Sequence, residues 1–306
     1  MLGRVAAMGA FRARHRSGIA LVQVLVIVAI LSVMGLSFTR DTRDALQITR
    51  WNDDRIQAEL NVRDAEAALL YQLITVDRSA AGIPETNSPL TQRWNFWGDT
   101  FDFSDTTKIA IQDQSSLLHV NYPEEDYFIK LAVYLGYSPD DAAGLLDEML
   151  DWQDLNSVPR NNGAERDQYG GVGIRNGAVP SVQELRWLRS IQPNSADALL
   201  SELTLYRRGG LNLFNASPNL IGALTTGVAA DQIKGLRDTR TVTIEQFKRI
   251  TGIEESFSVI FANTNFLAID IESQVGESSA KTHIVLQLNP KAEGNVPPVT
   301  IYKRQM

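Results

Sequence analysis

The feature that most constrains this chain is an uninterrupted apolar run near its N-terminus. Residues 19–38, IALVQVLVIVAILSVMGLSF, contain no charged side chain. As a helix, this segment would be about 30 Å long, which is the thickness of the hydrocarbon core of a bilayer. The preceding residues hold four arginines and no acidic residue, so the positive-inside rule places them in the cytoplasm. We therefore expect a membrane-spanning helix, with everything after Phe38 on the opposite side.

The residue before the apolar run separates several kinds of leader. A secretory signal peptide has an apolar region of about 7–15 residues and a small-x-small cleavage site, whereas this run is longer and continues into Thr39 and Arg40. Gly18, followed by Ile19 after a short arginine-rich leader, is similar to the processing site of type IV prepilins and of type II secretion pseudopilins. In those families the leader is removed after the glycine, which would make Ile19 the first residue. An uncleaved signal anchor is the alternative.

The helical pattern continues beyond the apolar run. Residues 40–76 contain neither Gly nor Pro, and Ile56, Leu60 and Leu70 fall on one helical stripe among charged residues. The sequence predicts one helix from Ile19 to about Thr75, and the stripe is expected to pair with helices of partner subunits. Two helices with a hinge near Gly35 or Thr39 are the alternative.

The remainder of the chain alternates between strand-like and helix-like segments, which predicts an α+β fold. Residues 79–92 are expected to form a loop. Strands are expected within 94–103, 107–121, 266–276, 281–289 and 298–305. Residues 122–255 are mostly helical in pattern and include a capping box at Ser181 and Glu184. They form two similar helix-hairpin units, so we expect a helical domain inserted into a sheet.

Composition and charge argue against several classes of function. The net charge is −7, and removing the arginine-rich leader makes it more negative, which disfavours a nucleic-acid-binding surface. There is no cysteine, and the three histidines lie on separate segments. No metalloprotease, hydrolase or phosphate-binding motif is present. The sequence therefore predicts a protein that is not an enzyme.

Residues 147–169, DEMLDWQDLNSVPRNNGAERDQY, form the one candidate binding loop. Asp151, Asp154, Asn156 and Glu165 offer hard oxygen ligands of the kind that calcium prefers. Their spacing is not that of an EF-hand. The alternative is a solvated acidic loop in which nearby arginines balance the charge.

A second possibility is DNA binding by the helix-hairpin units. Modules that grip DNA phosphates need a Gly-hydrophobic-Gly turn. The turns here, at 226–229 and 252–254, lack the second glycine, and Glu254 and Glu255 would repel phosphate. A DNA-interacting minor pilin remains the alternative function, and we expect no nucleic-acid binding.

Taken together, several motifs resemble those of the minor pseudopilin K family of bacterial type II secretion systems, over nearly the full length. These motifs are Gly18–Leu21, Leu150–Asp154, Gly163–Glu165, Ser181–Leu185 and Gly210–Ala216. The resemblance implies a pilin-like fold, with a long N-terminal helix, an antiparallel sheet and a helical domain inserted in the sheet. It implies no required cofactor, although members of the family can bind calcium as a structural ion.

The resemblance also implies a place in the cell and a set of partners. It implies a non-enzymatic subunit at the tip of a periplasmic pseudopilus, anchored once in the inner membrane, which initiates assembly with minor pseudopilins I and J and aids secretion across the outer membrane. Prepilin peptidase would process and methylate it, and the inner-membrane secretion platform would receive it. The expected divisions are a leader (1–18), a transmembrane half (19–38) and a periplasmic half (39–78) of the helix, the sheet (79–121 and 256–306) and the inserted domain (122–255).

Position 23 departs from ordinary pilins, and the departure has a physical meaning. The fifth mature residue of most pilins is Glu, whereas here it is Gln23. That buried carboxylate is thought to neutralise the N-terminal ammonium of the subunit above, since an unpaired charge in lipid is costly. A subunit with nothing above it needs no such carboxylate, so Gln23 fits a subunit at the tip.

Overall fold

The structure, a computed structural model, describes residues 17–78, 88–170, 173–289, 294 and 296–305. Most of the expected leader and most of the loop expected at 79–92 therefore lie outside the described residues. Gly18 and Ile19 belong to a described helix, but their side chains are outside the description.

The first helix, α1 (Ser17–Thr75), is one continuous helix of 59 residues. This confirms the prediction of a single helix, and there is no hinge at Gly35 or Thr39. The Thr39 hydroxyl donates to the carbonyl of Gly35 at 2.8 Å, as is usual for threonine within a helix. From Ala20 onward, α1 is long and apolar enough to cross a membrane, by length and composition.

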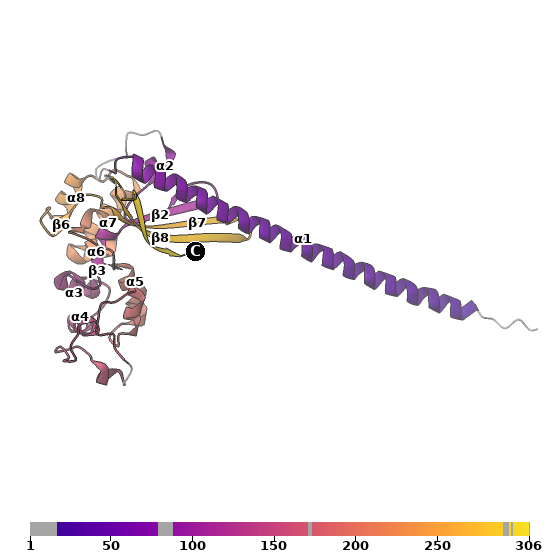
Figure 1. The fold of residues 1–306 in the computed structure, drawn as a ribbon, viewed down its shortest axis with the longest axis horizontal. Helices are drawn as coiled ribbons and strands as arrows, with labels where there is room; N and C mark the ends of the chain where they lie inside the picture. Colours follow the sequence, from indigo (N-terminus) through magenta and orange to yellow (C-terminus); the bar gives the residue numbers. More distant parts are fainter. Residues whose placement is uncertain (1–16, 79–87, 171–172, 290–293, 295, 306) are drawn as a thin grey trace, which may run out of the picture. The chain divides into compact units, whose positions relative to one another are not determined.

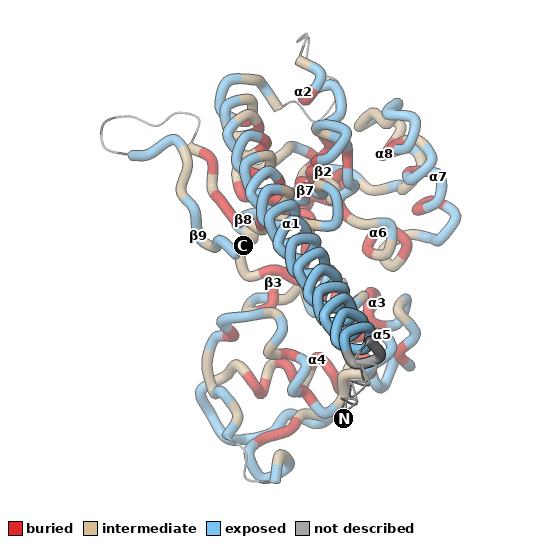
Figure 2. Tube along the Cα trace, turned by 90° about the vertical axis from the view of Figure 1, so that its right-hand side faces the viewer, coloured by how far each residue is buried: buried red, intermediate tan, exposed pale blue. Residues whose placement is uncertain are grey.

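The chain divides into two compact units, Met1–Ile56 and Gln57–Met306, and α1 continues through the boundary between them (Figure 1). In the first unit the described apolar side chains between Leu21 and Phe38 are all exposed (Figure 2). A stable helix with no buried side chain needs another environment for its apolar surface.

The second unit contains a five-stranded antiparallel sheet in the order β1-β2-β7-β8-β9. The strands are β1 (Phe101–Asp102), β2 (Thr107–Asp113), β7 (Phe266–Val275), β8 (Ser278–Leu288) and β9 (Val299–Gln305). A tight turn at Gly276 and Glu277 joins β7 to β8. The α+β fold predicted from the sequence, with a long N-terminal helix and an antiparallel sheet, is confirmed.

The last turns of α1 pack on one face of this sheet, beside β2 and β7 (Figure 1). The buried helix residues are Ala58, Val62, Ala65, Leu69 and Leu73. They meet alternating strand residues such as Ile109, Ile269 and Leu286, because every second side chain of a strand points to the same face. Arg304 of β9 pairs with Glu66, with Nη1 and Oε2 3.1 Å apart.

A mostly helical segment connects β2 to β7 and has a hydrophobic core of its own. Its elements are η1 (Gln114–Ser116), β3 (Leu118–His119), α3 (Glu125–Tyr134), α4 (Pro139–Gln153), η2 (Arg166–Tyr169), η3 (Val182–Trp187), α5 (Pro193–Ser201), β4 (Leu203–Thr204), β5 (Leu211–Asn212), η4 (Leu213–Asn215), α6 (Pro218–Leu224), α7 (Gly227–Asp238), α8 (Ile244–Thr251) and β6 (Val259–Ile260). A short helix, α2 (Pro89–Arg93), precedes β1.

The helical segment contains two units that are closed in the same way. In the first, β3 pairs in parallel with β4, and Leu118 lies opposite Leu203. In the second, β5 pairs in parallel with β6, and Leu211 lies opposite Val259. Each unit thus begins and ends at a two-residue parallel pair with helices between.

The buried carboxylate of Asp113 joins the sheet to the helical segment. Asp113 ends β2 and is fully buried. Its Oδ2 accepts hydrogen bonds from Asn212 Nδ2 at 2.8 Å and Asn215 Nδ2 at 3.1 Å, and its Oδ1 accepts one from Thr264 Oγ1 at 2.5 Å. The donors come from the start of the second helical unit and from the segment that leads into β7. One side chain therefore fixes where the chain leaves the sheet and where it returns.

The structure differs from the sequence predictions at three places. Only Phe101–Asp102 of the segment 94–103 forms a strand, and α2 occupies part of the expected loop. Glu184 does not complete a capping box, because its carboxylate binds Arg175 and Trp152 instead. Helix α5 begins at Pro193, a position where the missing amide N–H of proline costs no hydrogen bond.

Asp113→Ala should destabilise the second unit strongly. The substitution leaves the amide groups of Asn212 and Asn215 buried without their acceptor, so we expect the free energy of unfolding to fall by about 3 kcal/mol or more. Urea unfolding of the full chain in detergent, followed by tryptophan fluorescence, measures the change. Asp105→Ala is the matched control because Asp105 is exposed. Equal stability of the two variants would contradict the assigned role of Asp113.

Candidate functional site

The acidic loop predicted from the sequence begins in the last turn of α4. Ser138 caps this helix through its hydroxyl, which accepts from the amide of Asp141 at 3.1 Å, and Pro139 is its first residue. Helix α4 packs into the helical core, and its buried side includes Asp151 next to Trp152. The side chain of Asp151 is completely buried although it belongs to an acidic segment.

Asp151 organises the loop that follows. Its Oδ2 accepts a hydrogen bond from the amide of Arg160 at 3.0 Å, and the Arg160 Nε lies 3.5 Å from its Oδ1. Burial raises the pKa of Asp151, and the Arg160 amide opposes that rise. A Cβ atom at Gly163 would lie 1.9 Å from Asp151 Oδ2, so only glycine allows the backbone to approach this closely.

Asp154 and Asn156 bind the backbone of their own loop. Asp154 Oδ1 accepts from the amide of Asn156 at 3.1 Å, and Asn156 Oδ1 accepts from the amide of Val158 at 2.7 Å. Such side-chain turns are typical of Asp and Asn in loops. The structure therefore places Asp154 half-buried and Asn156 exposed in a surface turn, whereas Asp151 is buried.

Glu165 differs from the other predicted ligands. Only 4% of the residue is exposed, and its carboxylate lies beside the backbone amides at the start of η2 without forming a hydrogen bond of ordinary geometry. Burial raises the pKa of Glu165, and the nearby charges of Asp151 and Asp154 raise it further. A buried carboxylate with such weak donors is costly, so a proton or a cation would stabilise this group.

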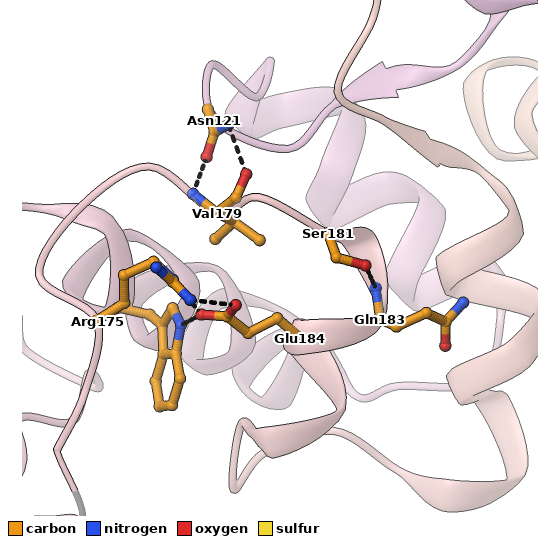
Figure 3. Close-up of polar contacts among 7 residues, drawn as sticks. Asn121, Arg175, Val179, Ser181, Gln183 and Glu184 are labelled. Carbon is orange, nitrogen blue, oxygen red and sulfur yellow. Dashed lines mark hydrogen bonds and ion pairs between the residues drawn. The ribbon is translucent and has the colours of Figure 1, made fainter. Parts of the chain in front are cut away.

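Two contacts that the sequence did not indicate fix the segment that follows the acidic loop, residues 175–184 (Figure 3). Asn121 exchanges two hydrogen bonds with the backbone of Val179, at 2.7 and 3.2 Å. Glu184 accepts from Arg175 Nη2 at 2.7 Å and from Trp152 Nε1 at 2.9 Å. The Arg175 contact lowers the pKa of Glu184, so this carboxylate is charged and paired.

The site thus has a rigid base and one unsatisfied group. Asp151 and Glu165 are both buried, and Asp154 is close enough to influence the pKa of each. Within the described residues, however, no three His, Cys, Asp or Glu side chains are grouped so that they could hold a metal ion. The orphaned Glu165 oxygens suit a hard cation such as calcium, but a full ligand set would require the loop 154–165 to close around it.

The turns considered for DNA binding have local structural roles. Thr226 caps α7 through its hydroxyl, and Gly227 is the first residue of that helix. Gly252 ends α8 with a φ of 69°, a left-handed conformation that glycine adopts without strain. Glu254 lies 3.2 Å from Lys248. One turn therefore caps the start of α7 and the other ends α8.

The other predicted site residues lie on α1. Gln23 is in its exposed first part, and two members of the predicted partner stripe, Ile56 and Leu60, lie outside the core. Ile56 is 57% exposed and Leu60 is 47% exposed, whereas Leu70 is half-buried and packs against the sheet core. The face that α1 uses within the second unit is therefore a different one, centred on Ala65 and Leu69.

Comparison with known proteins points to one system. A family model described as type II secretion system protein K matches residues 109–208, which run from β2 through α5. A type II secretion system protein K from Klebsiella pneumoniae is 31% identical over 196 residues, which is 57% of this chain. The chain resembles type II secretion protein K. The aligned region spans 58% of the length of the Klebsiella protein.

A solved structure supports the fold. The crystal structure of the GspK–GspI–GspJ complex from the type 2 secretion system of enterotoxigenic Escherichia coli contains a chain that matches with a TM-score of 0.54. The match covers 84% of this chain and 98% of that chain, at 15% sequence identity.

Gly163→Ala should disturb the acidic loop. The added methyl group would overlap Asp151 Oδ2, so the loop must shift, at a cost of about 1–3 kcal/mol. We expect a lower melting temperature for the full chain, measured by differential scanning fluorimetry. Gly173→Ala is the matched control, because no atom lies within 4 Å of its added Cβ. If both variants melt at the same temperature, Gly163 does not approach Asp151 in this way.

Proposed function

We propose that this chain is a minor pseudopilin of a type II secretion system, of the protein K kind. The observation that carries the proposal is the family match over residues 109–208. This stretch includes β2 and the first helical unit. The helical unit is the part that a pilin built only from a helix and a sheet would lack. The long apolar α1 supports the same proposal, because it provides a single membrane anchor.

The proposed position is the tip of a periplasmic pseudopilus. The segment between β2 and β7 has its own core and adds bulk beside the sheet, which suits a terminal subunit better than one stacked within a thin filament. Gln23 supports this position, because a subunit without a neighbour above needs no carboxylate to neutralise that neighbour's ammonium. The role is structural and non-enzymatic, with assembly initiated from the inner membrane after cleavage between Gly18 and Ile19.

The proposed partners are the minor pseudopilins I and J of the same system. This proposal draws on the GspK–GspI–GspJ complex that the fold resembles. On this chain, the exposed side chains of Ile56 and Leu60 offer an apolar stripe for another helix. Prepilin peptidase and the inner-membrane secretion platform complete the proposed set of partners.

Leu60→Asn should weaken the complex with the I and J subunits without unfolding this chain. Burying a leucine side chain contributes about 1.5–3 kcal/mol, so we expect about tenfold or more loss of co-purified partners from detergent-solubilised membranes. Asp64→Asn on the same helix is the matched control, because Asp64 is also exposed. A melting temperature equal to that of the parent excludes misfolding. Undiminished recovery of both partners would contradict the proposed use of the stripe.

We also propose that a calcium ion binds the acidic loop, with Glu165, Asp151, Asp154 and Asn156 supplying oxygens. The proposal is supported by the buried carboxylate of Glu165, whose oxygens make no hydrogen bond of ordinary geometry among the described residues. A cation there would replace the hydrogen bonds that this carboxylate lacks. Binding would have its structural effect by drawing the exposed turn at Asp154 toward the buried base of the loop.

Calcium should raise the melting temperature of the parent chain and leave Glu165→Gln unchanged. At a concentration of about 100 times the dissociation constant, we expect a rise on the order of 5 °C. Without calcium, Glu165→Gln should be at least as stable as the parent, because it removes a buried charge. Asp167→Asn, an exposed change in the same loop, should keep the calcium response. An unchanged response in Glu165→Gln would exclude Glu165 as a ligand.

A further inference from the structure

A groove lies where the linker between the two helical units crosses the sheet. It has a volume of about 590 Å³, and its lining includes His119, Tyr122, Tyr206, Arg208, Phe266 and Tyr302. The walls come from the linker 205–209 and from the segment after β3, and the floor comes from β7 and β9. All of these residues belong to the second unit.

The floor of the groove is aromatic and faces away from α1. Phe266 lies opposite Gln287 in the sheet register, whereas the next residue, Leu267, belongs to the core under α1. Tyr302 sits at the register shift of β9 and donates from its hydroxyl to Gln287 Oε1 at 2.7 Å. Its ring centroid is 5.6 Å from that of Phe266 and 6.2 Å from that of Tyr206. Tyr302 remains 44% exposed, so the floor is open to a ligand.

The groove is positively charged although the chain is acidic. None of its lining residues carries a carboxylate. Arg207 is already paired, because its Nη1 lies 2.9 Å from Glu124 Oε2. Burial and the charge of Arg207 lower the pKa of His119, which leaves its ring neutral near pH 7. Arg208 is therefore the cation that the groove presents.

Arg208 is positioned to bind a carboxylate. It is exposed, and its guanidinium carbon lies 5.1 Å from the ring centroid of Phe266. Among the described residues no ion pair is found for it. A guanidinium held over a ring has its orientation fixed while its N–H groups, which lie in its own plane, stay available for bidentate binding.

The edge of the sheet adds a second recognition element beside this cation. Tyr302 belongs to β9, the last strand in the sheet order, which pairs with β8 on one side only (Figure 2). Within the described residues, the other edge of β9 has no partner strand. An unpaired edge can accept an extended peptide through main-chain hydrogen bonds, while neighbouring pockets select its side chains.

We propose that this groove docks an extended acidic segment of a partner protein, with a carboxylate on Arg208 and an apolar side chain on the exposed ring of Tyr302. This goes beyond the proposed role of α1 in assembly, because it assigns a second interaction surface on the opposite face of the sheet. Charge complementarity selects the partner: a groove without carboxylates on an acidic protein favours an acidic peptide over a basic one.

Fluorescence anisotropy tests the proposal with the full chain in detergent. The probe is a labelled peptide of eight residues in which glutamate and valine alternate, and the matched probe carries glutamine in place of glutamate. We expect saturable binding of the acidic probe, weakened by about tenfold or more in Arg208→Glu. Arg249→Glu makes the same charge change at an exposed arginine of α8, outside the groove, and should alter the affinity by less than about twofold.

Each other outcome would overturn the proposal. Equal binding of the acidic and neutral probes would exclude the role of the carboxylate. Equal weakening by Arg208→Glu and Arg249→Glu would show only a general charge effect. Concentration-dependent self-association that is lost in Arg208→Glu, without peptide binding, would assign the groove to a second copy of this chain instead. Because α1 is untouched by these variants, failure of this test leaves the proposed role in secretion unaffected.

Discussion

The fold of the second unit depends on one buried carboxylate at the end of a strand. Asp113 is fully buried, and a charge in that position is tolerated only when donors surround it. The donors are Asn212, Asn215 and Thr264, which are separated from Asp113 by about a hundred residues or more of chain. Long-range pairing of this kind fixes both ends of the helical segment at one place on the sheet.

A neighbouring set of contacts extends this junction to α1. Arg78, just beyond the helix, donates to the carbonyl of Thr264 at 2.8 Å, and Asn263 donates back to the carbonyl of Arg78 at 2.9 Å. The end of α1, the end of β2 and the start of β7 therefore meet at one polar cluster. The sheet core and the helical core have no residue in common among those described. The packing of the helical segment is therefore independent of the packing of α1 on the sheet.

Much of this architecture could be predicted from sequence because the patterns are local. The length of α1 follows from the absence of Pro and Gly over 40–76, and the hairpin of β7 and β8 follows from strict alternation around Gly276. Helix α8 lies within the segment 122–255 that was predicted to be mostly helical, and the structure shows a capping box between Thr243 and Gln246 at its start. These elements need no information from distant parts of the chain.

What the sequence could not predict depends on distant partners. Asp113 looks like any acid at a strand end until Asn212 and Asn215 are placed beside it, and Glu184 looks like a capping residue until Arg175 reaches it. In the acidic loop, the four predicted ligands read alike in sequence, yet the structure buries Asp151 and Glu165, half-buries Asp154 and exposes Asn156. Burial, which distinguishes a ligand from a solvated acid, is set by how α4 packs and by the close approach of Gly163.

The measurement that most directly tests the central claim is the mass of the N-terminus after co-expression with a prepilin peptidase. A pseudopilin loses its leader on the cytoplasmic side and keeps its apolar helix. We expect a mature chain that begins at Ile19, and we expect that replacing Gly18 with a bulky residue blocks the cut. A chain that keeps its leader under these conditions, while a known pseudopilin in the same cells is processed, would contradict it.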